Sequence, residues 1–147
     1  MTISRKVLRV AYASMSIVAL IGCGINDLQY RKLGPGAFVY FWKETLVNPA
    51  SRSITIDIFF FLLAAMIWMF LEARRLSIGG VWVWFYALFG FFIAISAAFP
   101  AFLFHREIAL ARRDGSASAG TLSVLEILFV IILWILFLAY TFVALPK

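Results

Sequence analysis

The 147-residue chain is poor in the residue types that build redox and metal centres, with one cysteine, Cys23, and one histidine, His105. A single cysteine excludes an intramolecular disulfide bond and any multi-cysteine metal site. A single histidine leaves too few imidazoles for a histidine-based zinc site. The chain also carries no cofactor-binding motif, so the sequence predicts a protein without a metal centre or a cofactor.

Charged residues are scarce as well. They make up 14% of the chain, whereas 65% of the residues are hydrophobic and 18% are aromatic, and the mean hydropathy is +1.01. A soluble domain of this size could not bury so much apolar surface. The composition therefore predicts an integral membrane protein that forms one membrane domain, residues 1–147.

The net charge of +6 does not indicate a nucleic-acid partner. The Lys and Arg residues stand at the ends of the apolar runs, where anionic lipid headgroups attract basic side chains. We therefore expect the lipid bilayer as the partner and no nucleic acid.

The most informative stretch is residues 48–75. Asn48 is a typical N-cap, and Pro49 suits the first position of a helix. The run from 54 to 71 is apolar except for Thr55 and one acid, Asp57. The stretch predicts a membrane-spanning helix at about 52–73 that carries an acid inside the span. We expect Glu72 at its charged end to pair with Arg74 or Arg75.

Three further apolar runs are long enough to cross a bilayer, at about 8–26, 81–104 and 122–145. Residues 37–47 are too short to cross, and their apolar side chains recur at helical spacing, which indicates an interfacial helix. Residues 114–120 have the composition of a flexible linker. The predicted fold is an all-α bundle of four transmembrane helices with a short interfacial helix.

The N-terminus has two interpretations. Its basic start, short apolar region and the segment from Leu20 to Cys23 resemble a bacterial lipoprotein signal, with Cys23 as the lipid-anchored residue. The favoured interpretation is an uncleaved first span, because signal-like starts are often retained when further spans follow. In that case Cys23 is a small packing residue.

The third predicted span combines small residues with a proline. Pro100 removes the hydrogen bond to the carbonyl of Ser96, so a kink is expected there. A stripe of small residues at helical spacing would let another helix approach closely. The stripe consists of Ala87, Gly90, Ala94, Ala97, Ala98 and Ala101.

Four straight crossings would divide the polar residues between two sides. One side would collect Asn26, Asp27, Asn48, Arg52, Asp57, His105, Arg106, Glu107 and Glu126. The opposite side would collect Arg5, Lys6, Arg9, Glu72, Arg74, Arg75 and Lys147. Counting Lys and Arg gives six on the N-terminal side against seven on the other, which does not decide the orientation. The purely basic flank before the first span favours a cytoplasmic N-terminus and C-terminus in a bacterial plasma (inner) membrane.

Asp57 has two competing roles. It lies about 12 Å along its helix at ~1.5 Å per residue, and a charge inside a span costs about 3 kcal/mol on insertion scales, so it should face the bundle and have a partner. The favoured hypothesis is a structural polar cluster made of Asn26, Asn48, Arg52, Asp57 and Arg106. The alternative is a general acid, with Glu126 or His105 as assisting catalytic candidates.

Glu126 also has a structural explanation. The segment from Ser123 to Glu126 fits the capping box S-x-x-E, in which serine and glutamate each bond the other's backbone N–H. We favour the capping role over a catalytic pairing with Asp57.

Two segments resemble a known family. They are Asn48…Asp57…Glu72-Ala73-Arg74-Arg75-Leu76 and Phe99-Pro100-Ala101-Phe102-Leu103-Phe104-His105-Arg106-Glu107. Together they resemble the bacterial family catalogued as domain of unknown function 2834, which consists of small multi-span membrane proteins. The resemblance covers about residues 8–110, so the fourth span looks like an addition. It implies a bacterial membrane location and no known activity.

Three classes of function remain open. The favoured class is a structural or accessory subunit of a membrane complex, whose partners would be other membrane subunits. The second is a membrane-embedded acid catalyst, of cyclase or isomerase type, acting on an isoprenoid or other lipid substrate with Asp57 as general acid. A transporter or channel ranks last, because too few polar groups inside the spans line a path.

Overall fold

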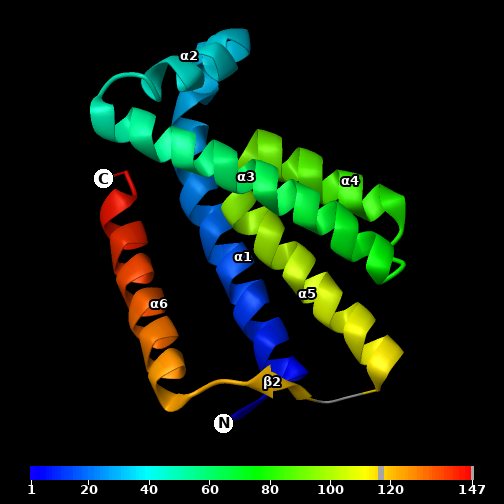
Figure 1. Cartoon of the computed structure of the whole chain (residues 1–147). Helices are drawn as coiled ribbons and strands as arrows, with labels where there is room; N and C mark the ends of the chain where they lie inside the picture. Colours follow the sequence, from blue (N-terminus) through cyan, green and yellow to red (C-terminus); the bar gives the residue numbers. More distant parts are fainter. Residues whose placement is uncertain (116–117, 147) are drawn as a thin grey trace.

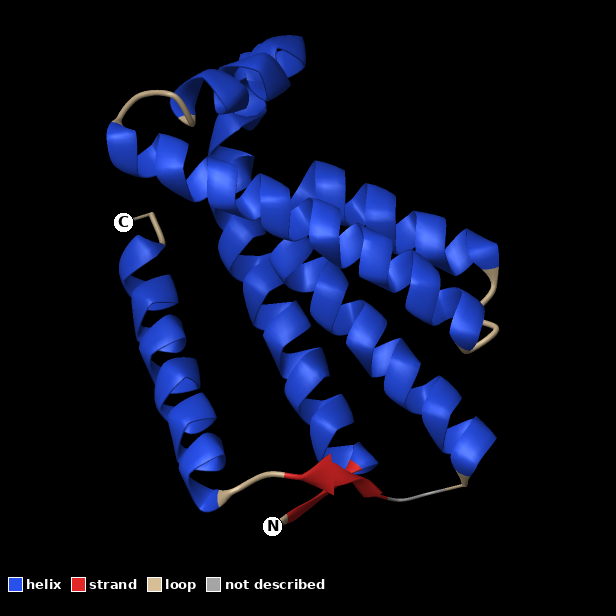
Figure 2. Ribbon diagram, in the orientation of Figure 1, coloured by secondary structure: helices blue, strands red, loops and turns tan. Residues whose placement is uncertain are grey.

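The computed structural model describes residues 1–115 and 118–146 and is almost entirely helical (Figures 1 and 2). In chain order the elements are β1 (Thr2–Ser4), α1 (Arg5–Asp27), the 3-10 helix η1 (Leu28–Gly36), α2 (Ala37–Glu44), α3 (Pro49–Arg75), α4 (Gly80–Phe89), the π-turn η2 (Gly90–Ala94), α5 (Ile95–Asp114), β2 (Ser118–Thr121) and α6 (Val124–Ala144). Figure 1 shows α5 and α6 flanking α1, while α3 and α4 cross the bundle obliquely.

Four helical segments are long and apolar enough to cross a membrane. They are Arg5–Glu44, Pro49–Arg75, Gly80–Asp114 and Val124–Ala144. The predicted all-α fold with four candidate membrane spans is therefore confirmed, with a minor two-stranded sheet in addition.

Two helix starts follow from local sequence chemistry. The Asn48 side chain accepts a hydrogen bond of 2.9 Å from the Ser51 N–H and so caps α3. Ser123 and Glu126 form the predicted capping box at the start of α6: Ser123 N–H donates to Glu126 Oε2 at 2.7 Å, and Glu126 N–H donates to Ser123 Oγ at 3.2 Å. Each cap satisfies backbone donors that a helix leaves unpaired.

The segment from Gly80 to Asp114 is not a straight helix. Tyr86 Oη lies 3.3 Å from His105 Nδ1, although 19 residues of straight helix would separate them by about 28 Å. The chain turns back at η2, where Ala94 leaves the helical region with φ −164° and ψ 115°. Helices α4 and α5 thus form a hairpin. The break precedes Pro100, which lies within α5.

A glycine permits this turn. A β-carbon at Gly90 would lie 3.1 Å from Ile95 Cδ1 and 3.3 Å from Ala98 Cβ, which is closer than an ordinary van der Waals contact. Gly90, a member of the small-residue stripe, therefore lets η2 pack against the first turns of α5 in the same segment. The stripe also serves a second helix, because the fully buried Ala97 accepts a hydrogen bond of 2.9 Å from Ser16 Oγ of α1.

The hairpin changes which ends of the helices meet. The C-terminal half of α5 lies beside the start of α1, where Arg5 binds Glu107 at 2.9 Å. Strand β1 pairs antiparallel with β2, and the Leu122 N–H donates to Met1 O at 3.1 Å. The division of polar residues expected from four straight crossings is therefore wrong for His105, Arg106, Glu107 and Glu126, because α5 reverses the direction of the third segment.

The two ends of the chain also lie apart. Helix α6 begins beside Met1 and extends for 21 residues, or about 31 Å at 1.5 Å per residue. Figure 1 shows the N-terminus at one end of α6 and the C-terminus at the other. If α6 crosses the bilayer, this packing puts the two termini on opposite sides of it, whereas the sequence led us to expect both in the cytoplasm. Of the predicted linker 114–120, residues 116 and 117 lie outside the described residues, and residues 118–120 are part of β2.

The main hydrophobic core lies between α3, α4 and α5. Its buried members are Met69, Ala73, Val83, Tyr86 and Phe102. Met69 and Phe102 are fully buried. In contrast, α6 has no buried residue. The core thus holds the α4–α5 hairpin against α3 and leaves α6 at the periphery.

Thiol cross-linking tests the hairpin. In a Cys23→Ala background, Tyr86→Cys combined with Phe102→Cys should cross-link efficiently with a short bifunctional thiol reagent, because the two rings lie 5.7 Å apart. A matched control is Trp84→Cys with Phe102→Cys, since Trp84 contacts Phe70 of α3 instead. Equal cross-linking of the two pairs, or none in the first, would contradict the hairpin.

Candidate functional site

Six charged side chains form a chain of alternating sign at one end of the bundle. Its order is Arg75, Glu72, Arg106, Glu107, Arg5 and Asp114, and we call it the charge network. The contacts are Arg75 Nε to Glu72 Oε2 at 2.6 Å, Arg106 Nε to Glu72 Oε1 at 2.7 Å, Arg106 NH1 to Glu107 Oε1 at 2.7 Å, Arg5 NH1 to Glu107 Oε2 at 2.9 Å and Arg5 NH2 to Asp114 Oδ2 at 3.5 Å. The network joins α1, α3 and α5.

The two central carboxylates are removed from solvent. The Glu107 side chain is 2% exposed and that of Glu72 is 9% exposed, and each lies between two guanidinium groups. A buried charge is tolerated only when it is paired and hydrogen-bonded. The helices can therefore pack around Glu72 and Glu107 only while these ion pairs are present. The outer members, Arg75 and Asp114, remain exposed.

Helical geometry explains how one helix reaches two neighbours. Arg106 and Glu107 are consecutive in α5, and successive residues of an α-helix project about 100° apart. Arg106 therefore contacts Glu72 of α3, while Glu107 contacts Arg5 of α1. On α3, Glu72 and Arg75 are three residues apart on one face. Their predicted pairing is confirmed.

Aromatic side chains cover one flank of the charge network. The Arg106 guanidinium carbon lies 5.8 Å from the centre of the Trp68 ring, within the range of a cation–π contact. His105 packs edge-on against Trp82, with ring centroids 5.7 Å apart, and its Nδ1 faces Tyr86 Oη. His105 is thus part of the α4–α5 packing.

The predicted structural polar cluster does not assemble. Arg106 belongs to the charge network, whereas the Asn26 amide donates to Gly22 O at 2.9 Å within its own helix. Asn48 caps α3, and Arg52 NH1 donates to Leu46 O at 2.9 Å. Asp57 is exposed and has no hydrogen bond or ion pair among the described residues. Its hypothetical partners are therefore engaged elsewhere.

Asp57 lies on an exposed part of α3. Trp42 of α2 packs on Phe59 of α3, with ring centroids 5.4 Å apart. Helix α2 thus contacts α3 at Phe59, while Asp57, two residues earlier, stays exposed. The predicted depth of about 12 Å assumed a helix perpendicular to the membrane, but α3 crosses α1 obliquely (Figure 1).

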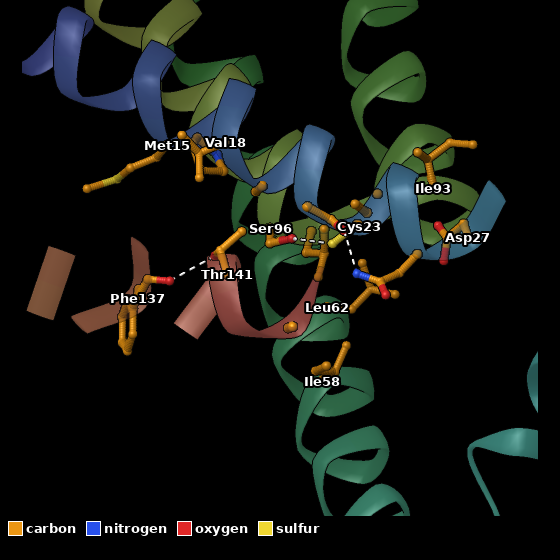
Figure 3. Close-up of a pocket in the computed structure, with 18 of the residues that line it drawn as sticks. Met15, Val18, Cys23, Asp27, Ile58, Leu62, Ile93, Ser96, Phe137 and Thr141 are labelled. Carbon is orange, nitrogen blue, oxygen red and sulfur yellow. Dashed lines mark hydrogen bonds between the residues drawn. The ribbon is translucent and has the colours of Figure 1, made fainter. Parts of the chain in front are cut away.

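The three catalytic candidates do not share one site. Asp57 is exposed on α3, Glu126 is engaged in its capping box at the start of α6, and His105 packs on α4. Cys23, the candidate lipid anchor, is half-buried with its Sγ 3.7 Å from Ser96 Oγ of α5 (Figure 3). Its contact is with a neighbouring helix.

Sequence reasoning missed the charge network because it assigned Glu72 and Arg106 to opposite sides. The adjacent pair Arg106-Glu107 was a usable signal, since two opposite charges at the end of an apolar run need partners of both signs on other helices when they are buried. Arg5 was treated as one of several basic residues of the N-terminal flank. Its burial, at 9% exposure, becomes clear only in the packed structure.

The fold and the charge network define a small helical membrane protein whose spans are joined by interhelical ion pairs. The chain belongs to the family of proteins of unknown function DUF2834, whose family model matches residues 11–108. No curated protein and no solved structure matches the chain. Four members of the charge network lie inside the matched region: Glu72, Arg75, Arg106 and Glu107. Arg5, Asp114 and α6 lie outside it.

Removing one central charge should destabilise the bundle. Glu107→Gln leaves Arg5 and Arg106 without their shared carboxylate, and removing one member of a buried pair costs about 3 kcal/mol. The free energy of unfolding in mixed micelles, measured by SDS titration, should fall by that amount. Asp57→Asn is the matched control, because the same acid-to-amide change at an exposed residue should alter stability by less than ~0.5 kcal/mol. A similar loss in both variants would refute the structural role of Glu107.

Proposed function

We propose that the protein is a structural or accessory subunit of a membrane complex in the bacterial plasma membrane. The observation that carries this proposal is that every buried side-chain polar atom among the described residues has a hydrogen-bond partner. The buried charges are engaged in joining helices. An interior arranged in this way gives a rigid scaffold rather than a reaction centre.

The distribution of charge supports an orientation for this subunit. Eight basic residues lie at the end that carries the charge network: Arg5, Lys6, Arg9, Arg74, Arg75, Arg106, Arg112 and Arg113. Four lie toward the other end: Arg31, Lys32, Lys43 and Arg52; Lys147 lies outside the described residues. By the positive-inside rule, this excess favours the charge network and N-terminus in the cytoplasm. The C-terminal end of α6 then faces the periplasm.

The alternative function, an acid catalyst acting on an isoprenoid or other lipid with Asp57 as general acid, gains no support from the geometry. Such a catalyst would hold an acid and an assisting group around one cavity. Asp57 is exposed on α3, while Glu126 is bound to Ser123 at the start of α6. The accessory role therefore accounts for more of the observed contacts.

Native mass spectrometry of the tagged protein, extracted gently from its own membrane, tests the proposal. The expected result is a species heavier than the 16.6 kDa chain that contains one defined protein partner in a constant ratio. An assembly of this kind needs an intact scaffold. Recovery of the chain alone, or of copies of this chain alone, would contradict the accessory role.

Two protein variants, compared in the same experiment, distinguish the accessory role from the acid-catalyst role. With membrane amounts matched, Asp57→Asn should retain the partner, because Asp57 makes no hydrogen bond or ion pair among the described residues. Glu107→Gln should release it, because the charge network no longer positions α1, α3 and α5. Partner loss in Asp57→Asn with retention in Glu107→Gln would reverse the assignment of the two acids.

A further inference from the structure

A deep apolar cleft of about 1230 Å³ lies between α1 and α6 (Figure 3). Met15 and Val18 of α1, Leu62 of α3, Ile93 of η2 and Phe137 of α6 are among its walls. The volume exceeds the ~300–1,000 Å³ of most small-molecule pockets. Its walls belong to candidate membrane spans, so the medium outside the cleft is lipid hydrocarbon.

The cleft is amphipathic along its length. Helices α1 and α6 approach each other at Gly22, where an added β-carbon would be 3.0 Å from Thr141 Cγ2. Toward the C-terminal ends of both helices, the lining includes Asn26, Asp27 and Tyr30. The other end is lined by aliphatic and aromatic side chains. A ligand that matches this change from a polar to an apolar lining has a polar head and long apolar chains.

Asp27 indicates the charge of that head. It is half-buried, lines the cleft, and has no hydrogen bond or ion pair among the described residues. The next basic residues, Arg31 and Lys32, make no ion pair with it. An unpaired, half-buried carboxylate favours a cationic hydrogen-bond donor beside it.

We propose that the cleft binds one phospholipid with a primary ammonium headgroup, such as phosphatidylethanolamine. Its acyl chains occupy the apolar part, and the ammonium group donates hydrogen bonds to the Asp27 carboxylate. Flexible acyl chains follow the irregular walls of the cleft. They give the lining side chains dispersion contacts that an empty cleft would lack. This site is independent of the accessory role, since it requires only the chain itself.

The experiment uses the full-length protein in micelles supplied with equal amounts of dioleoyl phosphatidylethanolamine, phosphatidylcholine and phosphatidylglycerol. Native mass spectrometry should show one retained phosphatidylethanolamine per chain. Ala19→Trp fills the cleft, because Ala19 is part of its lining, and should reduce that retention about tenfold. Leu20→Trp is the matched control on α1, since Leu20 is exposed outside the cleft. It should retain the lipid.

The headgroup assignment has its own pair of variants. Asp27→Asn should reduce the preference for phosphatidylethanolamine over phosphatidylglycerol about tenfold while a lipid is still bound. Glu44→Gln removes one acid from α2 outside the cleft lining and should leave the preference unchanged. An unchanged preference in Asp27→Asn would overturn the ammonium assignment.

The unmodified protein provides a further measurement. Cys23 is the single cysteine and lines the cleft, so a membrane-permeant maleimide should react with it more slowly in phosphatidylethanolamine vesicles than in phosphatidylglycerol vesicles. Equal rates would contradict the site. Equal lipid retention in Ala19→Trp and Leu20→Trp would show lipid bound elsewhere. A dimer that Ala19→Trp abolishes would show that a second copy occupies the cleft.

Discussion

The bundle depends on one buried carboxylate that is shared by two guanidinium groups. Glu107 binds Arg5 of α1 through one oxygen and its neighbour Arg106 through the other. The Glu107 side chain is buried, so these charges have few alternative partners, because an unpaired buried ion is costly. The pairing therefore specifies which helices meet and in which direction. Hydrophobic packing alone is less selective, since lipid tails are as apolar as the side chains.

The charge network and the α4–α5 hairpin depend on each other. A straight segment from Gly80 to Asp114 would carry Arg106 and Glu107 away from the end of α3. The turn at η2 returns α5 so that Arg106 meets Glu72, and Phe102 fills the space between α3 and α4. The same turn places the start of α6 beside the N-terminus. That arrangement leaves α6 in contact with α1 near Gly22 and opens the apolar cleft between them.

Features governed by local chemistry could be predicted from the sequence. The caps by Asn48 and Ser123 depend on side chains within four residues of each helix start, and the spans follow from apolar length. The reversal at η2 could not be predicted, because five apolar and small residues continue the composition of a span. Pro100 gave the stronger local signal, yet α5 includes it.

The candidate site could be predicted only in part, because some of its contacts are local and others depend on the hairpin. The pairing of Glu72 with Arg75 is local and was predicted correctly, whereas the partners of Arg106 depend on the hairpin. Asp57 drew attention as an acid inside an apolar run. Its exposure depends on which face of α3 the other helices cover, which is a tertiary property. An acid in a predicted span therefore does not by itself indicate burial.

A double-mutant cycle on Arg5 and Glu107 tests the central role of this ion pair most directly. The free energy of unfolding in mixed micelles would be measured for Arg5→Met, Glu107→Met and the double variant. If the pair joins α1 to α5, each single variant leaves a buried charge without one of its two partners, and the double variant should be less destabilised than the two single losses combined, by about 1–3 kcal/mol. Strictly additive losses would contradict the account, because they would mean that Arg5 and Glu107 stabilise the protein independently of each other.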